Sequence, residues 1–345
     1  MKRILVVTLL ALAGFAASAQ SKYMPWTDLR PGKTVFLYAS DATAAVAAID
    51  DPVISADIEC LGLAIKEDCG ISNPECMEGD LGQIREINGT SRFDLYFPEN
   101  PNGQMVVICP GGGYWVVCTY GEGLYVAEWL LKRGITVAVA KHRMPNGHWT
   151  VPLDDMQEIF RYCRTHAASW GVNKIGVMGF SAGGHLATSV STLYIDDVTR
   201  PDFSILYYPV ITFDKEEYVE HGSRANLIGS EEYWATRRGM TADEYIERRK
   251  AHEFLKEHYS LENRVNANTP PAFIVLGQND RTVLPMNSIL YYQKLLENGV
   301  RSELHIFEQG SHGFCFFPEG KPDFLPADVR AAINGSLERW LKQME

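Results

Sequence analysis

The stretch that decides the fold is residues 174–187, which read KIGVMGFSAGGHLA. Its first residues form an apolar run typical of a buried strand, and a helical pattern begins directly after the glycine-rich centre. Ser181 lies at the centre of this Gly-x-Ser-x-Gly motif. A sharp turn from strand to helix needs glycines where a Cβ would clash, and it exposes the serine hydroxyl at the edge of a sheet. Ser181 is therefore a candidate nucleophile; the alternative is a glycine-rich turn in which Ser181 only caps the helix.

Apolar runs of similar length alternate with helical patterns along the rest of the chain. Continuous runs suit strands that are buried on both faces, and helical crossovers between them predict a parallel sheet with helices on both sides. The expected fold class is therefore α/β, with a mostly parallel, doubly wound sheet. The expected strands are 105–109, 135–140, 174–178, 203–208, 272–276 and 303–307, and the expected helices are 122–133, 153–169, 182–193, 285–298 and 326–343.

Two parts of the chain depart from this alternation. The pair Asn88-Gly89 separates two β-like runs, 84–87 and 92–97, and predicts a β-hairpin. Residues 213–268 carry charged helical segments without a buried strand, so we expect a helical insertion over the active-site end of the sheet. Its aromatic residues would then form part of the rim of a pocket: Tyr218, Tyr233, Trp234 and Tyr245.

Two further side chains follow expected strands at the edge where ligands bind in open α/β sheets. Asp280 comes soon after the strand 272–276, and His312 after the strand 303–307. A serine that attacks a carbonyl needs a general base, and the base needs an acid that holds it in the correct tautomer. The order Ser181, Asp280, His312 is the chain order of the α/β-hydrolase triad. The competing acids in the sequence are Asp202 and Asp214.

Donors for the developing oxyanion are expected from a second glycine-rich segment, PGGGY at 110–114. It follows the strand 105–109, where the backbone N–H of Gly112 or Gly113 can turn toward the carbonyl oxygen of a substrate. The N–H of Ala182, directly after the nucleophile, would be the other donor. The alternative is that the three glycines form only a flexible turn.

Aromatic residues beside this loop are the candidate substrate contacts. Tyr114 and Trp115 are expected to bind substrate, because aromatic faces suit sugar rings and acyl groups. Other histidines and tyrosines near the same edge either line the pocket or pack in the core: His142, His148, His185, Tyr207 and Tyr208.

Composition excludes several classes of partner and cofactor. The 345 residues carry 32 Lys and Arg against 43 Asp and Glu, a formal charge of -11, which argues against nucleic acid and anionic membrane surfaces. Zinc-type spacing of Cys and His is absent from the sequence. A serine nucleophile with its base and acid requires neither a metal nor an organic cofactor, so none is expected. Seven cysteines are an odd number, so at least one thiol stays free or pairs with another chain. Cys60, Cys69 and Cys76 could supply one disulfide, whereas those in apolar runs are expected to be buried thiols: Cys109, Cys163 and Cys315.

The first nineteen residues have the pattern of a cleavable signal peptide. Lys2 and Arg3 precede an apolar run at 4–17, and Ala17-Ser18-Ala19 is a small-x-small cleavage site. The run is too short for a membrane span, which takes ~20 residues. We therefore expect a secreted or periplasmic protein. The remaining chain divides into an irregular extension at 20–80 and a catalytic domain at 81–345.

From about residue 84 to its end the chain resembles the α/β-hydrolase-fold serine esterases, in particular exported bacterial carbohydrate esterases and acetylxylan esterases. PGGGY at 110–114 and GFSAGGHLA at 179–187 carry the resemblance. It implies hydrolysis of short acyl esters, acetyl above all, on plant polysaccharides or oligosaccharides such as xylan, through an acyl-enzyme. Esterases that are similar to hormone-sensitive lipase have a histidine where this chain has Pro110, so the resemblance points away from that branch.

Two other functions are compatible with the same motifs. A serine peptidase of the prolyl-oligopeptidase type shares fold and triad, but 80 N-terminal residues are too few for the propeller that such enzymes normally carry. A non-catalytic binding module would normally have lost a member of the triad, and here all three are present. The oligomeric state is not indicated by the sequence.

Overall fold

The computed structural model describes residues 29, 32–37, 77–78, 82–85, 87, 91–145, 148–318 and 325–345. Several expectations lie outside these residues: the signal peptide at 1–19, the turn at Asn88-Gly89, and the pairing of Cys60, Cys69 and Cys76. Within the described ranges, no helix is long and apolar enough to cross a membrane.

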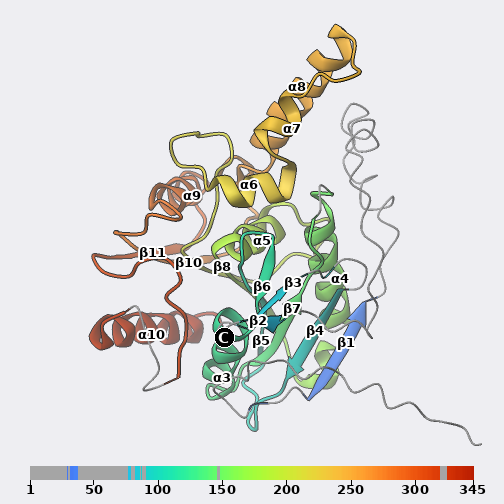
Figure 1. Ribbon diagram of the computed structural model, residues 1–345. Coiled ribbons are helices and arrows are strands. Elements are labelled where there is room, and N and C mark those ends of the chain that lie inside the picture. Colours follow the sequence, from blue (N-terminus) through green and yellow to red (C-terminus); the bar gives the residue numbers. More distant parts are fainter. Residues whose placement is uncertain are drawn as a thin grey trace, which may run out of the picture.

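An eight-stranded sheet forms the centre of the molecule (Figure 1). Its order is β1-β4-β7-β5-β8-β9-β10-β11, and its pairings are parallel except for β4, which runs antiparallel to β1 and to β7. The six expected strands and the mostly parallel α/β fold are confirmed. The strands are β1 (Lys33–Leu37), β4 (Ser91–Tyr96), β5 (Gln104–Cys109), β7 (Thr136–Lys141), β8 (Lys174–Phe180), β9 (Ser204–Tyr207), β10 (Ala272–Gly277) and β11 (Ser302–Phe307).

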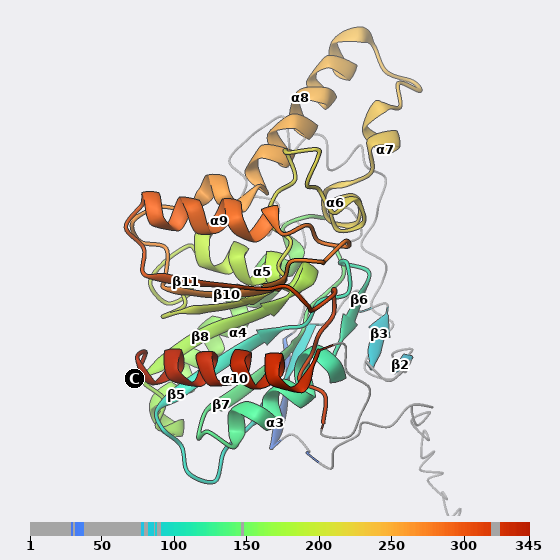
Figure 2. The ribbon, with the colours of Figure 1, turned by 90° about the vertical axis from the view of Figure 1, so that its left-hand side faces the viewer.

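Helices cover both faces of this sheet (Figure 2). The central strand β5 explains why, since Val107 belongs to one buried cluster and its neighbour Ile108 to the other. The first cluster includes apolar residues of α4, α5 and α9, and the second includes those of α3 and α10. The bounds are η1 (Tyr120–Leu124), α3 (Tyr125–Leu131), α4 (Val151–His166), η2 (Ala167–Trp170), α5 (Ser181–Thr192), α9 (Met286–Glu297) and α10 (Ala327–Lys342). The expectation of buried free thiols at Cys109, Cys163 and Cys315 is confirmed.

The predicted hairpin around Asn88-Gly89 is wrong. Its two runs become strands of different sheets, because β3 (Gln83–Arg85) pairs with β2 (Met77–Glu78) and β6 (Val116–Cys118), whereas β4 pairs with β1 and β7. Phe93 and Leu95 of β4 are fully buried in the main core. A strand buried in this way is stabilised more by two long neighbours than by a three-residue strand, so tertiary packing overrides the local turn signal.

Residues 213–268 contain helices and no strand, as expected. They form α6 (His221–Ile228), α7 (Glu231–Ala235), α8 (Ala242–His258) and the short η3 (Leu261–Arg264), and α8 projects from the body of the molecule (Figure 1). The start of α8 is fixed by a capping box between Thr241 and Glu244. Trp234 corrects the expected aromatic rim, because it is fully buried and stacks on His252 with ring centroids 5.0 Å apart. It belongs to the same buried cluster as the apolar residues of α4, α5 and α9.

Candidate active site

Ser181 lies at a sharp turn where β8 passes directly into α5. Its φ of +52° is in the left-handed region, which L-residues rarely adopt. The glycines of the motif allow close contact around it: a Cβ on Gly179 would lie 2.2 Å from the Gly183 carbonyl oxygen, and a Cβ on Gly183 would lie 2.1 Å from the Cys109 carbonyl oxygen. The motif therefore has small residues because the end of β5 and the start of α5 touch here.

The structure brings the three residues expected to form the triad into one hydrogen-bonded chain. His312 Nε2 lies 2.8 Å from Ser181 Oγ, and His312 Nδ1 lies 2.7 Å from Asp280 Oδ2. The Asp280 side chain is fully buried, whereas the His312 ring is about one fifth exposed. A carboxylate only accepts, so Nδ1–H donates to Asp280 and Nε2 is left to accept from the serine hydroxyl. This is the geometry that a serine nucleophile and its base require.

Asp280 is itself held by the backbone. Its Oδ1 accepts hydrogen bonds from the N–H groups of Thr282 and Val283, at 2.9 and 3.0 Å. The competing acids are engaged elsewhere, since Asp202 pairs with Arg164 and Asp214 accepts from Thr212. Asp280 is therefore the carboxylate that orients His312.

The loop at 111–113 presents two backbone N–H groups in a fixed direction. The carbonyl of Gly111 accepts from Cys118 N–H, and the carbonyl of Gly112 accepts from the N–H groups of Trp115 and Val116. In a trans peptide the N–H points opposite to the carbonyl, so the N–H groups of Gly112 and Gly113 both point away from residues 115–118. The N–H of Gly111 is already used, because it donates to Glu122 at 2.7 Å.

The start of α5 supplies the remaining expected donor. The carbonyl of Ser181 accepts from Val210 N–H at 3.0 Å, which fixes the peptide that carries the N–H of Ala182. The first N–H groups of a helix have no partner inside the helix, and they carry its positive dipole end. The glycine loop touches this helix end, since a Cβ on Gly111 would lie 3.0 Å from Ser181 Cβ. The loop that carries Gly112 and Gly113 therefore lies next to Ser181 and Ala182, and the oxyanion donors themselves stay a prediction.

The two aromatic residues beside the loop differ in position. Tyr114 is buried, and its hydroxyl donates to His185 Nδ1 at 2.9 Å, while His185 Nε2–H donates to the Tyr259 carbonyl. Burial lowers the pKa of His185 to about 4, so it is neutral. Tyr114 is therefore a buried structural residue and not the expected substrate contact, whereas Trp115 is 63% exposed.

The other histidines and tyrosines considered above are mostly structural. His142 is buried, and burial lowers its pKa to about 4. His148 is half-buried. Tyr207 and Tyr208 are buried in the core, although the Tyr208 ring packs edge-on against His312 at 4.8 Å between centroids.

One charged residue near the site was not expected from the sequence. Glu122 lies in η1, is 6% exposed, and accepts from Gly111 N–H and from the Tyr208 hydroxyl, at 2.7 and 3.0 Å. Burial raises the pKa of its carboxyl, and attraction to His312 acts in the opposite direction. The signal that would have found it is a single acidic residue between glycines, in a segment that otherwise reads as buried helix.

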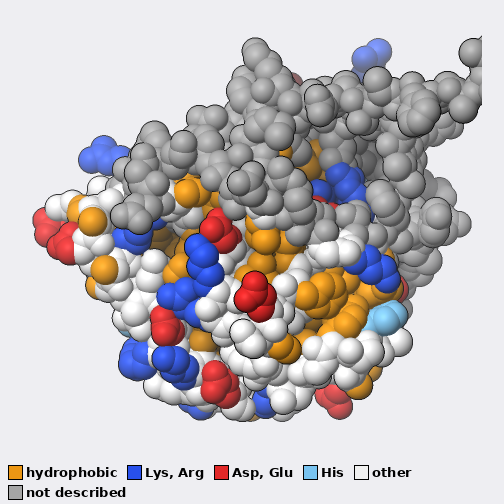
Figure 3. Space-filling model, turned by 90° about the horizontal axis from the view of Figure 1, so that it is seen from below, with side chains coloured by type: hydrophobic (Ala, Val, Ile, Leu, Met, Phe, Trp, Pro, Cys, Tyr) orange, Lys and Arg blue, Asp and Glu red, His pale blue; other side chains and the backbone are white. Residues whose placement is uncertain are grey.

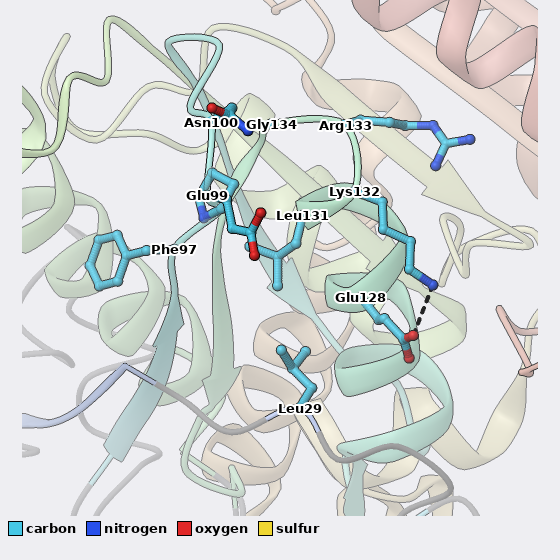
Figure 4. Close-up of a pocket in the computed structure, with 10 residues that line it drawn as sticks. Leu29, Phe97, Glu99, Asn100, Glu128, Leu131, Lys132, Arg133 and Gly134 are labelled. Carbon is cyan, nitrogen blue, oxygen red and sulfur yellow. Dashed lines mark hydrogen bonds and ion pairs between the residues drawn. The ribbon is translucent and has the colours of Figure 1, made fainter.

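A separate groove of about 780 Å³ lies at the opposite edge of the sheet. It is lined by residues 97–100, which follow the antiparallel strand β4, and by residues 131–134, which precede β7 (Figure 4). This places it at the amino ends of the parallel strands, away from Ser181. The face opposite the helical insertion has hydrophobic side chains among acidic and basic ones (Figure 3).

Comparisons with known proteins find curated relatives and solved structures that are similar to this chain. Over 234 residues, 66% of this chain, the sequence is 38% identical to an acetylxylan esterase of Xylanibacter ruminicola, of which the match spans 45%. Over 232 residues, 60% of this chain, it is 30% identical to endo-1,4-beta-xylanase B of Butyrivibrio fibrisolvens, of which the match spans 32%. The chain thus spans less than half of the length of these two curated relatives.

A solved structure is similar over a larger share of both chains. The acetyl ester-xyloside bifunctional hydrolase from Caldicellulosiruptor lactoaceticus superposes with a TM-score of 0.58 at 28% identity, covering 74% of this chain and 88% of that one. The sequence profile of a family described by its alpha/beta hydrolase fold matches residues 111–316. This range is more than half of the chain and includes Ser181, Asp280 and His312. The chain therefore belongs to the family of α/β-hydrolase-fold proteins.

Proposed function

We propose that this protein is a serine esterase that removes short acyl groups, acetyl above all, from xylan or related plant polysaccharides and oligosaccharides. The observation that carries the proposal is the hydrogen-bonded chain from Ser181 through His312 to Asp280, with the serine in a left-handed turn. The similarity to an acetylxylan esterase supports the choice of substrate.

The proposed reaction follows from the positions of these groups. Ser181 Oγ attacks the ester carbonyl while its proton passes to His312 Nε2, and the carbonyl oxygen becomes the oxyanion. The backbone N–H groups of Ala182 and of Gly112 or Gly113 stabilise that charge. His312 then gives its proton to the departing sugar oxygen, leaving an acyl-enzyme. A water molecule, deprotonated by His312, releases the acid and restores the serine.

Substrate contacts are proposed from the exposed surface beside the loop. Trp115 presents an aromatic side chain next to the glycines, with the Arg85 guanidinium 5.7 Å from its ring centroid. The acidic chain would disfavour anionic polymers by like-charge repulsion. The exposed aromatic side chain favours a sugar ring, and the negative charge of the protein favours a neutral polymer over an anionic one.

The chain would act outside the cytoplasm. We propose cleavage of residues 1–19 during export, with 20–80 as an extension and 81–345 as the catalytic domain that carries the insertion at 213–268. The amino-terminal sequence of the secreted protein tests this: it should begin at Gln20. Retention of Met1 on the exported protein would contradict cleavage.

The central experiment combines a covalent probe with a substrate panel. A fluorophosphonate should label the peptide containing Ser181, and acetate should be released from acetylated xylan faster than a long-chain ester or a proline-containing peptide is cleaved. Ser181→Ala should abolish both labelling and release. Preference for the peptide would instead indicate a peptidase, and labelling at another serine would contradict the nucleophile.

A further inference from the structure

Glu122 is a buried carboxylate directly behind the proposed oxyanion loop. A Cβ on Gly111 would lie 2.8 Å from Glu122 Oε2 and 3.0 Å from Ser181 Cβ, so the carboxylate and the nucleophilic residue both lie against the side of Gly111 on which a side chain would project. Even an alanine at position 111 would clash, because its Cβ would also lie 2.4 Å from the Phe180 carbonyl oxygen. The 111–113 loop, the strand-to-helix turn at Ser181 and Glu122 are therefore in direct contact.

Both oxygens of this carboxylate have neutral donors. Oε2 accepts from Gly111 N–H and Oε1 from the Tyr208 hydroxyl. The first bond fixes the orientation of the peptide before Gly111, and the Gly111 carbonyl is bonded to Cys118 N–H. Both polar backbone groups of Gly111 are therefore fixed by hydrogen bonds. The orientation of Gly111 in turn determines where the N–H groups of Gly112 and Gly113 point.

Tyr208 connects the same carboxylate to the base. Its ring packs edge-on against His312, and its own backbone is left-handed, with a φ of +38°. Its N–H donates to the Val275 carbonyl at 2.8 Å. The hydrogen bond from the Tyr208 hydroxyl to Glu122 thus fixes the orientation of the Tyr208 ring. The edge of that ring in turn limits the motion of the His312 imidazole.

We propose that Glu122 is a positioning residue for the reaction: it holds the 111–113 loop so that the amides of Gly112 and Gly113 face the oxyanion, and through Tyr208 it supports His312. This inference rests on the proposed function in its use of Ser181 as the nucleophile, His312 as the base and the 111–113 loop as a source of oxyanion donors, but not in the choice of substrate. Glu122 touches neither substrate nor the reacting atoms in this arrangement. Its contribution is needed most in the transition state, when the oxyanion and the protonated imidazole both form.

Two variants separate the hydrogen bond from the bulk of the side chain. Glu122→Met keeps the length but removes the acceptor for Gly111 N–H, so kcat should fall on the order of 10- to 100-fold with KM nearly unchanged, since deletion of one oxyanion donor costs ~10²–10³-fold. Glu122→Gln keeps an acceptor for Gly111 and can donate to the Tyr208 oxygen, so it should recover most of kcat. Glu128→Met is the matched control, because Glu128 lies on the neighbouring helix and pairs with exposed Lys132.

The rate of fluorophosphonate labelling at Ser181 gives a readout that does not depend on the acyl substrate. The tetrahedral adduct places an oxygen in the same oxyanion position, so Glu122→Met should slow labelling by a similar factor while Glu128→Met leaves it unchanged. Wild-type labelling rates for Glu122→Met, or equal losses for the Met and Gln variants, would overturn the inference. If Glu122→Met does not fold, Glu122→Asp decides: its shorter carboxylate should lower kcat at unchanged KM, and an unaffected kcat would overturn the inference.

The outcomes distinguish this inference from the proposed function. A wild-type protein that is labelled at Ser181 but releases no acetate would contradict the proposed substrate, and the labelling rates of the variants would still judge Glu122. Release of acetate by the wild type together with an unaffected Glu122→Met would contradict only the role of Glu122.

Discussion

At the scale of single residues, the two oxygens of Asp280 have separate tasks. Oδ1 is saturated by two backbone N–H groups, and Oδ2 is left for His312. An asparagine at this position has one acceptor oxygen. If that oxygen faces the backbone donors, the amide NH₂ faces His312 Nδ1 and forces it to accept. The proton then lies on Nε2, which can no longer accept from Ser181.

Asp280→Asn should therefore lower kcat by roughly 10⁴-fold while the protein stays folded, a magnitude known from other triads in which the wrong tautomer is imposed. Hydrolysis of an acetyl ester, with circular dichroism as the check on folding, measures this. Asp214→Asn is the control, since Asp214 accepts from Thr212 and pairs with Lys215 at the surface of the insertion. A severe loss in the control with a mild loss at Asp280 would show that the acid is misassigned.

At the scale of elements, α5 is packed end-on against β5 with no room for a side chain at Gly183. A Cβ added to Gly183 would lie 2.1 Å from the Cys109 carbonyl oxygen and 2.5 Å from the Pro110 carbonyl oxygen. Gly335 in α10 offers a comparison, because a Cβ there would meet nothing within 4 Å. Both are helical glycines, so alanine gains the same intrinsic helix propensity at each.

Gly183→Ala should lower the free energy of unfolding by ~1–3 kcal/mol, because backbone must shift to admit the methyl group, and should also lower kcat by moving the loop away from Ser181. Gly335→Ala should raise the free energy of unfolding by ~0.5–1 kcal/mol and leave kcat unchanged. Urea denaturation and ester hydrolysis measure the two effects. Equal stability changes in both variants would show that the close contact does not exist.

At the scale of the whole molecule, buried and half-buried histidines couple stability to pH. Partial burial lowers the pKa of His258 to about 4, whereas an unfolded chain titrates near ~6.5. Between these values the unfolded state binds more protons, so the free energy of unfolding contributed by this residue falls as pH falls. The other buried histidines act in the same sense, and buried carboxyls with raised pKa values, such as Glu122, act in the opposite sense.

Replacing His258 isolates its contribution to the pH dependence of the free energy of unfolding. In His258→Asn the loss of stability between pH 7 and pH 5 should be smaller than in the wild type by roughly 1–2 kcal/mol. Urea denaturation at both pH values measures this, and identical pH dependence for His258→Asn and the wild type would refute the coupling.

Sequence reasoning succeeded where one local pattern determined one outcome. Continuous apolar runs of strand length favoured buried strands. The glycines of the turn at Ser181 are required because a Cβ on Gly179 or Gly183 would lie less than 2.5 Å from a backbone carbonyl oxygen. The positions of Asp280 and His312 followed from the edge at which parallel strands end. The order of the strands was not accessible in this way, because the partners of β4 depend on contacts far along the chain.

Residues whose roles depend on partners far away along the chain could also not be identified from the sequence. Glu122 belongs to a helix that reads as core, and its meaning depends on Gly111 and Tyr208, which are 11 and 86 positions away. Tyr114 was expected to bind substrate from its place beside the glycines. Its hydroxyl instead reaches His185, a partner 71 positions away that no local pattern indicates.

The left-handed backbone at Ser181 has an evolutionary consequence. An L-residue in this region of backbone conformation is strained by ~1–2 kcal/mol, whereas glycine is not. Glycine instead loses more conformational entropy on folding, which costs ~0.5–1 kcal/mol. A single change, Ser181→Gly, would therefore abolish the nucleophile without lowering the stability of the fold. Mutational drift toward an inactive but well-folded protein meets no thermodynamic barrier at this position. Only selection for turnover keeps the serine in place, so relatives that lose this selection are expected to lose the nucleophile before they lose the fold.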